Sequence, residues 1–203
     1  MNILIEKKLR LATEKDAIDI LKVYKPYIEK TSITFEIDVP KEEDFIQRVM
    51  GICQNYPFLV YEIDGKIVAY AYSNRYLERA AYGWNVQFSV YVAEEYCQNL
   101  HIGTALYTAL KEISKLQNVQ NVYSLVADSN EKSFAFHQKI GFNKLATYSS
   151  VGYKLGQWHD VSIFQMILGE HQNPPKPFVA IGDLPLNQVA DILAECEKII
   201  ELK

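Results

Sequence analysis

The segment between Phe58 and Tyr76 constrains the fold most, because it has the pattern of a β-hairpin whose register is set by its turn. Two runs rich in strand-favouring residues, 58–63 and 66–76, are separated only by Asp64-Gly65. Asp-Gly is a dipeptide typical of the two-residue turn that joins antiparallel strands. The sequence therefore predicts an antiparallel hairpin at this point of the chain.

The remaining segments alternate between helical and strand periodicity, which predicts helices layered on a mixed sheet. Helices are predicted at residues 13–29, 103–116, 131–139 and 186–200, and another begins near Pro40. Strands are predicted at residues 3–11, 86–92, 122–127, 144–155 and 160–168, and residues 31–39 are also rich in strand-favouring residues. The predicted fold class is α/β (α+β), with an additional C-terminal helix.

Composition places the chain among soluble globular proteins. It has 203 residues, of which 49% are hydrophobic and 23% charged, and a net charge of −4 without any Lys/Arg cluster. These values argue against nucleic acid or an anionic membrane as the main partner. The longest uncharged run, 80–93, is shorter than the roughly 18 apolar residues of a membrane span, and the charged N-terminus does not resemble a secretion signal. We therefore expect a cytoplasmic location.

A change of composition after Leu168 predicts the domain organisation. We expect a main domain at residues 1–168, a proline-rich linker at 169–178 and a C-terminal helical extension at 179–203. Periodicity does not say whether the extension docks on its own subunit or on a partner. The three cysteines are far apart without a CxxC pair, and the four histidines show no ligand spacing. Neither a disulfide nor a metal site is predicted.

Residues 97–106, CQNLHIGTAL, resemble a turn that binds phosphate and opens a helix. The N-terminus of a helix presents unpaired backbone N–H groups and a partial positive charge. An ordinary strand-to-helix turn also contains a glycine such as Gly103, and short glycine motifs are weak signals. From the residues alone both interpretations stand, and His101 occupies a position where a phosphate-binding turn is expected to have glycine.

Several short motifs occur in the order and spacing of the GCN5-related N-acetyltransferases (GNAT). They are Ser89-Val90-Tyr91-Val92, the turn with Gln98 and Gly103, Asn130-Glu131-Lys132-Ser133, His137 and Gly141-Phe142. The segments Thr34-Phe35-Glu36, Asp64-Gly65, Trp84 and 152–161 extend the match to the phosphinothricin N-acetyltransferase-like subgroup. The chain thus resembles this family over about residues 8–168. The resemblance implies a mixed, mostly antiparallel, splayed sheet flanked by helices.

The resemblance also implies that acetyl-CoA is the co-substrate and lies between two separated strands. In the family, a strand backbone pairs with the pantetheine arm, the next turn wraps the diphosphate, and an asparagine further on reaches the cofactor. The matching residues are Val90, Tyr91, Val92, Gln98, Asn99, Leu100, His101, Ile102, Gly103, Thr104 and Asn130. His101 replaces a glycine of the family pattern. We expect binding to be retained, because histidine tolerates positive φ and a protonated imidazole attracts a diphosphate.

Acetyl transfer by direct attack requires a route for the amine proton and donors for the developing oxyanion. The resembling subgroup carries a glutamate where this chain has Gln87, and an amide does not accept a proton at neutral pH. His137 matches the position that assists the leaving thiol in the family, although spacing alone favours a histidine packed in the core. Gln87 and His137 are therefore the candidate catalytic positions. Cys97 has no activating base near it in the sequence, so a turn cysteine is the simpler interpretation than an acetylated nucleophile.

Four residues are candidates for binding the acceptor amine. Arg75 and Arg79 can bind a carboxylate bidentately, although an exposed loop arginine is the alternative. Phe35 and Tyr82 can line the pocket, although aromatic residues of a sheet are more often part of the core. His159 is either structural or part of the same pocket.

The sequence predicts an acetyl-CoA-dependent N-acetyltransferase that acts on a small-molecule amine, such as an amino acid or an analogue of the phosphinothricin or methionine sulfone type. A homodimer is expected. Gln87 and His101 together motivate the alternative, which is a catalytically weak or silent acyl-CoA-binding or oligomeric interaction module.

Overall fold

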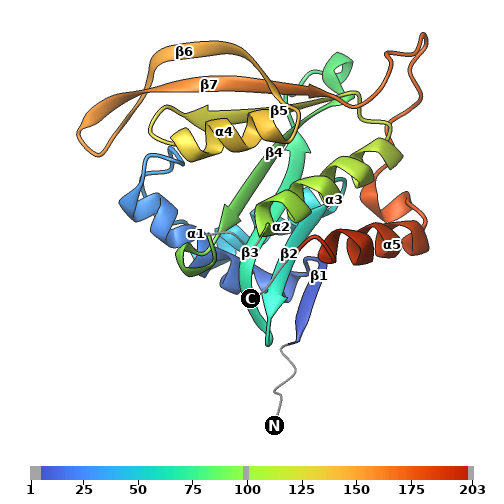
Figure 1. Ribbon diagram of the computed structural model, residues 1–203, viewed down its shortest axis with the longest axis horizontal. Coiled ribbons are helices and arrows are strands. Elements are labelled where there is room, and N and C mark those ends of the chain that lie inside the picture. Colours follow the sequence, from blue (N-terminus) through green and yellow to red (C-terminus); the bar gives the residue numbers. More distant parts are fainter. Residues whose placement is uncertain (1–5, 98–100, 201–203) are drawn as a thin grey trace.

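A seven-stranded sheet organises the chain, of which the computed structural model describes residues 6–97 and 101–200 (Figure 1). The strands lie in the order β1-β2-β3-β4-β5-β7-β6, and only β4 and β5 are parallel neighbours. The strands are β1 (Lys7–Leu11), β2 (Phe58–Ile63), β3 (Lys66–Arg75), β4 (Asn85–Val92), β5 (Asn121–Ala127), β6 (Asn143–Lys154) and β7 (Gln157–Ile167). The helices are α1 (Ala17–Lys30), α2 (Glu42–Cys53), α3 (Ile102–Leu116), α4 (Glu131–Lys139) and α5 (Leu186–Glu197).

Different helices cover the two faces of the sheet. Tyr24 of α1 packs against Tyr91 of β4 with the ring centroids 4.8 Å apart, whereas Tyr107 of α3 packs against Phe88 of the same strand at 5.7 Å. Side chains point alternately to the two faces of a strand, so positions 88 and 91 lie on opposite faces. Helix α2 packs on α1, and α5 packs on α3. The sheet is therefore the middle of three layers.

The predicted hairpin is confirmed in its turn and its register. Asp64 and Gly65 have φ angles of 48° and 75°, which is the left-handed pair of conformations that a type I′ turn requires. Ile63 pairs with Lys66 across the turn. The other predicted strands and helices appear with end shifts of a few residues. The first strand begins at Lys7, and residues 3–5 of its predicted range, 3–11, lie outside the described residues.

Residues 31–39 form a loop despite their strand-favouring composition. Thr31 Oγ1 donates to the Tyr27 carbonyl at 2.8 Å and accepts from the Ile33 N–H at 3.2 Å. Such local side-chain bonds compete with strand pairing. The Thr34 carbonyl accepts a hydrogen bond from Lys154 Nζ at 2.7 Å. The loop thereby connects the α1 side of the molecule to β6.

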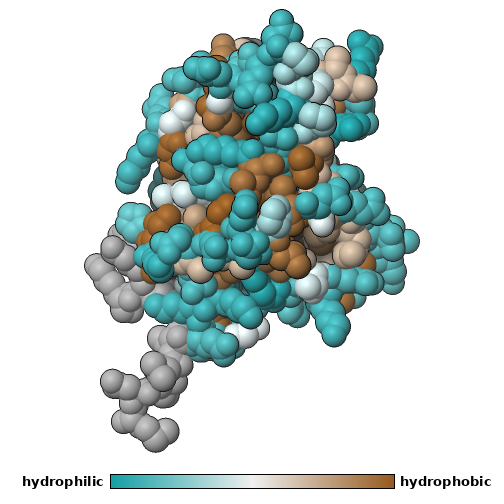
Figure 2. Space-filling model, turned by 90° about the vertical axis from the view of Figure 1, so that its right-hand side faces the viewer, coloured by the Kyte–Doolittle hydropathy of each residue, from teal (hydrophilic) through white to brown (hydrophobic). Residues whose placement is uncertain are grey.

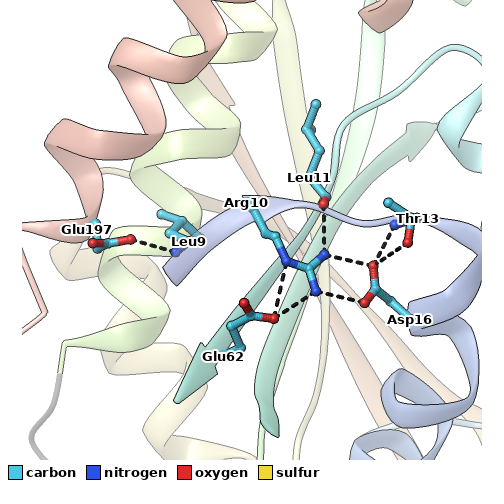
Figure 3. A network of polar contacts seen from close by, with 7 residues as sticks. All are labelled: Leu9, Arg10, Leu11, Thr13, Asp16, Glu62 and Glu197. Carbon is cyan, nitrogen blue, oxygen red and sulfur yellow. Dashed lines mark hydrogen bonds and ion pairs between the residues drawn. The ribbon is translucent and has the colours of Figure 1, made fainter. Parts of the chain in front are cut away.

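A polar network around Arg10 joins β1 to β2 and to the start of the first helix (Figure 3). Arg10 Nη1 and Nη2 each lie 2.8 Å from an oxygen of Asp16, and Nη2 lies 2.7 Å from Glu62 Oε2. Thr13 donates to Asp16 Oδ2 through its backbone N–H and its hydroxyl. These bonds, chiefly the one from Arg10, lower the pKa of Asp16 to about 2. The Asp16 carboxylate thus fixes the geometry at which the chain enters α1.

The C-terminal segment docks on its own subunit, which the sequence had left open. Glu197 Oε2 of α5 accepts the backbone N–H of Leu9 in β1 at 2.7 Å (Figure 3). The segment before α5 is also bonded to the main domain. Trp84 Nε1 donates to the Lys176 carbonyl at 2.7 Å, and Asn118 Nδ2 donates to the Pro177 carbonyl at 2.8 Å. Figure 2, which views the side of the molecule that carries α5, shows mostly hydrophilic groups around a smaller hydrophobic area. The apolar side chains Val189, Leu193 and Cys196 of α5 are buried.

Candidate active site

The parallel strands β4 and β5 are paired over three residues only. The pairs are Asn85 with Asn121, Val86 with Val122 and Gln87 with Tyr123. On its other side β4 stays paired with β3 as far as Val92. From residue 88 to 92, β4 has no strand partner on the β5 side among the described residues. We call this stretch, residues 88–92, the free edge of β4.

The backbone N–H and C=O of Val90 point away from β3, to the unpaired side of β4. Phe88 offers its carbonyl on the same side, where the Ser124 hydroxyl of β5 donates to it at 3.2 Å. Alternate residues of a strand direct their N–H and C=O groups the same way, so Val90 follows Phe88, whereas Tyr91 pairs with Tyr70 of β3. The Val92 carbonyl accepts from the Tyr27 hydroxyl at 2.5 Å. The donor and acceptor groups of Val90 fit an extended chain that contains amides, such as pantetheine.

His101 has the left-handed backbone conformation directly before α3, with φ 57° and ψ 14°. Its carbonyl accepts the N–H of Ala105 at 2.9 Å, so it is the N-cap residue of the helix. The backbone N–H groups of Ile102, Gly103 and Thr104 belong to the first turn, where α-helices leave donors without intrahelical partners. These donors suit a diphosphate. Gln98, Asn99 and Leu100, which the sequence assigns to the same turn, lie outside the described residues.

Gln87 stands at the last pair before the strands part. Its strand neighbours Val86 and Phe88 are buried on the α3 face, so the Gln87 side chain lies on the face that carries α1. Asn74 of β3 pairs with Gln87 and shares that face. An amide at this point can donate and accept hydrogen bonds but holds no negative charge.

His137 lies inside the molecule on the α3 face, with 3% of its surface exposed. Its Nδ1 is 2.7 Å from the Ser133 carbonyl, and its Nε2 is 2.9 Å from the Tyr107 hydroxyl and 2.8 Å from the Ser124 hydroxyl. Burial lowers the pKa of His137. The imidazole is therefore neutral at pH 7 and linked through Ser124 to the first residue of the free edge, Phe88.

Asn130 and Cys97 have structural contacts in the free protein. Asn130 is the N-cap of α4 and accepts the Ser133 N–H at 3.2 Å through Oδ1. Cys97 donates through Sγ to the Val92 carbonyl at 3.2 Å, and partial burial raises the pKa of its thiol. A protonated thiol is a poor nucleophile.

The four candidate acceptor residues occupy two separate regions. Arg75 pairs with Val86, which places it on the α3 face, and it donates through Nη1 to the Glu78 carbonyl at 3.2 Å. Arg79 and Tyr82 lie in the connection between β3 and β4, and Tyr82 is exposed. Phe35 lies in the 31–39 loop against Gly152 of β6. Only the last of the four reaches the β6–β7 half of the sheet.

Three polar residues that sequence reasoning missed belong to this part of the structure. Lys154 is 4% exposed, and burial lowers its pKa although its ammonium donates to the Thr34 carbonyl. Glu36 forms an ion pair with Arg48 of α2. Ser124 and Lys154 stand out in the sequence only as polar residues at buried strand positions. His159 is buried between Asp128 and the Lys154 carbonyl, 3.2 Å from each, which favours its structural interpretation.

Neither a metal-binding cluster nor a membrane-spanning helix occurs in the described part of the chain. No group of three or more His, Cys, Asp or Glu side chains in residues 6–97 and 101–200 is placed to hold a metal ion. Over the same part of the chain, no helix combines the length and the apolar character needed to cross a membrane.

Comparison with known proteins gives a family match that covers most of the chain. Residues 9–163 match the family described as "Acetyltransferase (GNAT) domain". The chain is 31% identical over 170 residues to the phosphinothricin N-acetyltransferase of Streptomyces viridochromogenes, with 84% of this chain and 92% of that protein covered. It is 29% identical over 119 residues to the L-methionine sulfoximine/L-methionine sulfone acetyltransferase of Salmonella typhimurium, with 59% and 69% covered.

Solved structures give the same result for the fold. The crystal structure of a GNAT superfamily phosphinothricin acetyltransferase from Sinorhizobium meliloti, in complex with AcCoA, superposes with a TM-score of 0.78 at 27% identity. This alignment covers 88% of the present chain and 96% of the Sinorhizobium chain. The two chains therefore share a fold.

Proposed function

Since this chain belongs to the GNAT acetyltransferase family and is an acetyl-CoA-dependent N-acetyltransferase, we propose that its acceptor is the amine of a small amino acid or amino-acid analogue. The relatives named for phosphinothricin and for methionine sulfoximine or sulfone support this class of acceptor. A relative from Escherichia coli is named L-amino acid N-acyltransferase and is 25% identical over 170 residues. All three names describe amino acids or their analogues as acceptors.

The observation that carries the proposal is the free edge of β4. Acetyl-CoA supplies an activated acetyl thioester when it is bound. In our proposal the N–H and C=O of Val90 hold its extended arm, and the first-turn N–H groups of α3 after His101 hold its diphosphate. A backbone N–H of the free edge also polarises the thioester carbonyl, because a strand holds such a donor in a fixed direction. Asn130 donates to the cofactor through its side-chain NH2 group, since its side-chain oxygen already caps α4.

Proton transfer is assigned to His137 in this proposal. Its imidazole is neutral at pH 7, because burial lowers its pKa, and a neutral imidazole can accept a proton. Gln87 orients the acceptor by hydrogen bonding, because an amide at that position cannot be the base. Direct attack of the amine then needs no nucleophile of the enzyme, which agrees with the protonated thiol of Cys97.

The acceptor enters, in this proposal, between the 31–39 loop and the connection of β3 with β4. Phe35 supplies an apolar wall, and Tyr82 a second one from the other side. Arg79 binds the carboxylate of an amino acid, since a guanidinium recognises carboxylates bidentately. Arg75, which lies at the end of β3 on the α3 face, is the alternative. Both arginines are exposed in the free protein.

We also propose a homodimer with a cytoplasmic location. The β6–β7 hairpin supports the dimer because it carries large apolar side chains that the monomer leaves exposed: Leu145, Tyr148, Val151, Tyr153, Leu155 and Trp158. Several large apolar side chains exposed on one hairpin are typical of a protein interface. Sedimentation of the purified chain at two concentrations tests the dimer. The division of the chain into a main domain at residues 1–168, a linker at 169–178 and a C-terminal extension at 179–203 is also part of the proposal.

One observation favours a second function. Gln87 gives the site no carboxylate at the point where the strands part, which suits a silent acyl-CoA-binding or oligomeric interaction module. A screen for CoA release over amino acids, polyamines and aminoglycosides decides between the two. Turnover with an amino acid, lost in His137→Ala, supports the enzyme. Binding of acetyl-CoA without release of CoA for any amine supports the module.

A further inference from the structure

Ser124 is the first residue of β5 beyond the last pair with β4, and its hydroxyl contacts three different elements. It lies 3.2 Å from the Phe88 carbonyl on the free edge of β4, 3.0 Å from the Tyr107 hydroxyl of α3 and 2.8 Å from His137 Nε2 of α4. Ser124 is 3% exposed. Of the two hydroxyls within hydrogen-bond distance of His137 Nε2 among the described residues, the Ser124 hydroxyl also bonds to the backbone of the free edge, whereas Tyr107 meets Phe88 through its ring.

The contacts of His137 fix its tautomer. A carbonyl oxygen only accepts hydrogen bonds, so Nδ1, at 2.7 Å from the Ser133 carbonyl, carries the proton. In the neutral ring Nε2 then has a lone pair and accepts. The Tyr107 and Ser124 hydroxyls both lie within hydrogen-bond distance of this single lone pair. Only one of them can donate to it at a time.

The network therefore has two proton arrangements on the same heavy atoms. In the first, Tyr107 donates to Nε2 and Ser124 donates to the Phe88 carbonyl. In the second, Ser124 donates to Nε2 and Tyr107 donates to the Ser124 oxygen, which leaves the Phe88 carbonyl free on the cofactor side. Rotation of the two hydroxyl hydrogens interconverts them. The imidazole also lies near the Ser133 hydroxyl, 3.2 Å from Nδ1, and near the aromatic rings of Phe136, Phe142 and Phe164.

We propose that Ser124 is a catalytic residue that relays protons between His137 and the reacting groups at the free edge. This inference rests on the proposed function. As the amine nitrogen forms its bond to the acetyl carbon and the carbon–sulfur bond breaks, the amine proton passes to the Ser124 oxygen while the Ser124 proton passes to His137 Nε2. The reverse transfer delivers a proton to the departing sulfur, so the products are the amide and CoA thiol. The route gives this chain a proton path that needs no carboxylate at Gln87.

The test compares Ser124→Ala with Ser162→Ala. Ser162 of β7 is a matched control, because its hydroxyl is equally buried and bonds to Thr147 Oγ1, outside the His137 network. We expect Ser124→Ala to lower kcat by about tenfold to a hundredfold, the range of a proton-transfer contribution, with the acceptor KM and the acetyl-CoA Kd within about twofold. Ser162→Ala keeps kcat. Ser124→Thr, which restores a hydroxyl, recovers most of the rate.

Two readouts separate the relay from a structural role. The wild-type kcat falls at acidic pH as His137 becomes protonated, and this dependence disappears in Ser124→Ala. The 15N resonance of His137 Nε2 shifts in Ser124→Ala and stays unchanged in Ser162→Ala. If Ser124→Ala does not fold, Ser124→Cys, which is close in size and a weak hydrogen-bond partner, replaces it with the same expected loss of kcat.

Three results overturn the inference. The first is a kcat of Ser124→Ala equal to that of Ser162→Ala while the wild type turns over, which leaves the proposed function intact. The second is an unchanged Nε2 resonance in Ser124→Ala. The third is a wild type that does not release CoA with any amine of the screen. This result removes the proposed function and the relay together.

Discussion

Gln87 of β4 and Tyr123 of β5 form the last pair between the two parallel strands, so an uncharged amide stands where the strands part. We expect Gln87→Glu to raise CoA release with amino-acid acceptors by about tenfold or more, because it adds a base on the acceptor face. A thiol-reactive dye measures the release. Asn74→Asp is the matched control, since it places a carboxylate on the neighbouring strand and the same face. Equal rates in the wild type and Gln87→Glu would show that the proton path does not use this position.

His101 keeps a left-handed backbone at the start of α3, where a side chain with a β-carbon is strained. We expect His101→Gly to raise the free energy of unfolding by about 0.5–1 kcal/mol, the strain of a left-handed residue less the flexibility of glycine. The acetyl-CoA Kd, measured by calorimetry, stays within about threefold, because the N–H groups that follow keep their direction. Ser150→Gly is the control, since Ser150 also has a left-handed backbone, with φ 48°, but lies in β6, outside the proposed cofactor site. It should leave the acetyl-CoA Kd unchanged. A Kd raised tenfold or more in His101→Gly would mean that the imidazole itself holds the cofactor.

Asp16 makes folding stability depend on pH at the acidic end. Its folded pKa of about 2 lies below the ordinary aspartate value of 3.8. The stability that Asp16 contributes is therefore nearly complete above about pH 4 and is lost as the pH falls toward 2. The shift corresponds to about 2 kcal/mol. Urea unfolding at pH 6, 4 and 2.5 should show this loss in the wild type and not in Asp16→Asn. Asp19→Asn, which removes an exposed pair with Lys22, should behave like the wild type, and the same slope in Asp16→Asn would contradict the assignment.

Gly152 leaves room for the ring of Phe35. A β-carbon at position 152 would lie 2.1 Å from Phe35 Cε2, so the ring must move in Gly152→Ala. We expect the acceptor KM to rise about threefold to tenfold, with the acetyl-CoA Kd unchanged, because Phe35 is a proposed wall of the acceptor site and is not among the proposed cofactor-binding residues. Steady-state kinetics with the best acceptor of the screen measures this. Gly169→Ala, where a β-carbon meets nothing within 4 Å, should leave both constants unchanged. An unaltered acceptor KM in Gly152→Ala would remove Phe35 from the acceptor site.

Local patterns predicted the elements well, and contacts between distant residues account for what they missed. Asp64-Gly65 specifies its turn through backbone conformation alone, so the hairpin and its register could be read directly. Residues 31–39 have a strand-like composition, yet Thr31 satisfies the backbone locally and Lys154, 120 residues further on, bonds to the Thr34 carbonyl. No periodicity carries information about such a contact.

The candidate site divides in the same way. Gln87 lies near the start of a strand and His101 directly before a helix, and both positions follow from the sequence pattern. The burial of His137 and its bonds to Tyr107 and Ser124 depend on how α3, α4 and β5 pack. Sequence could suggest a histidine with a suitable pKa, and only the packing shows that both of its nitrogens are occupied.

The bond between Glu197 and Leu9 joins the last helix to the first strand. On the ribosome β1 is made first and α5 last, because synthesis runs from the N-terminus. Until α5 is made, the outer edge of β1 and the side of α3 that packs on α5 remain exposed. An uncovered strand edge invites pairing with other chains. A message that stopped after residue 168 would thus encode every candidate site residue and still yield a product prone to aggregate.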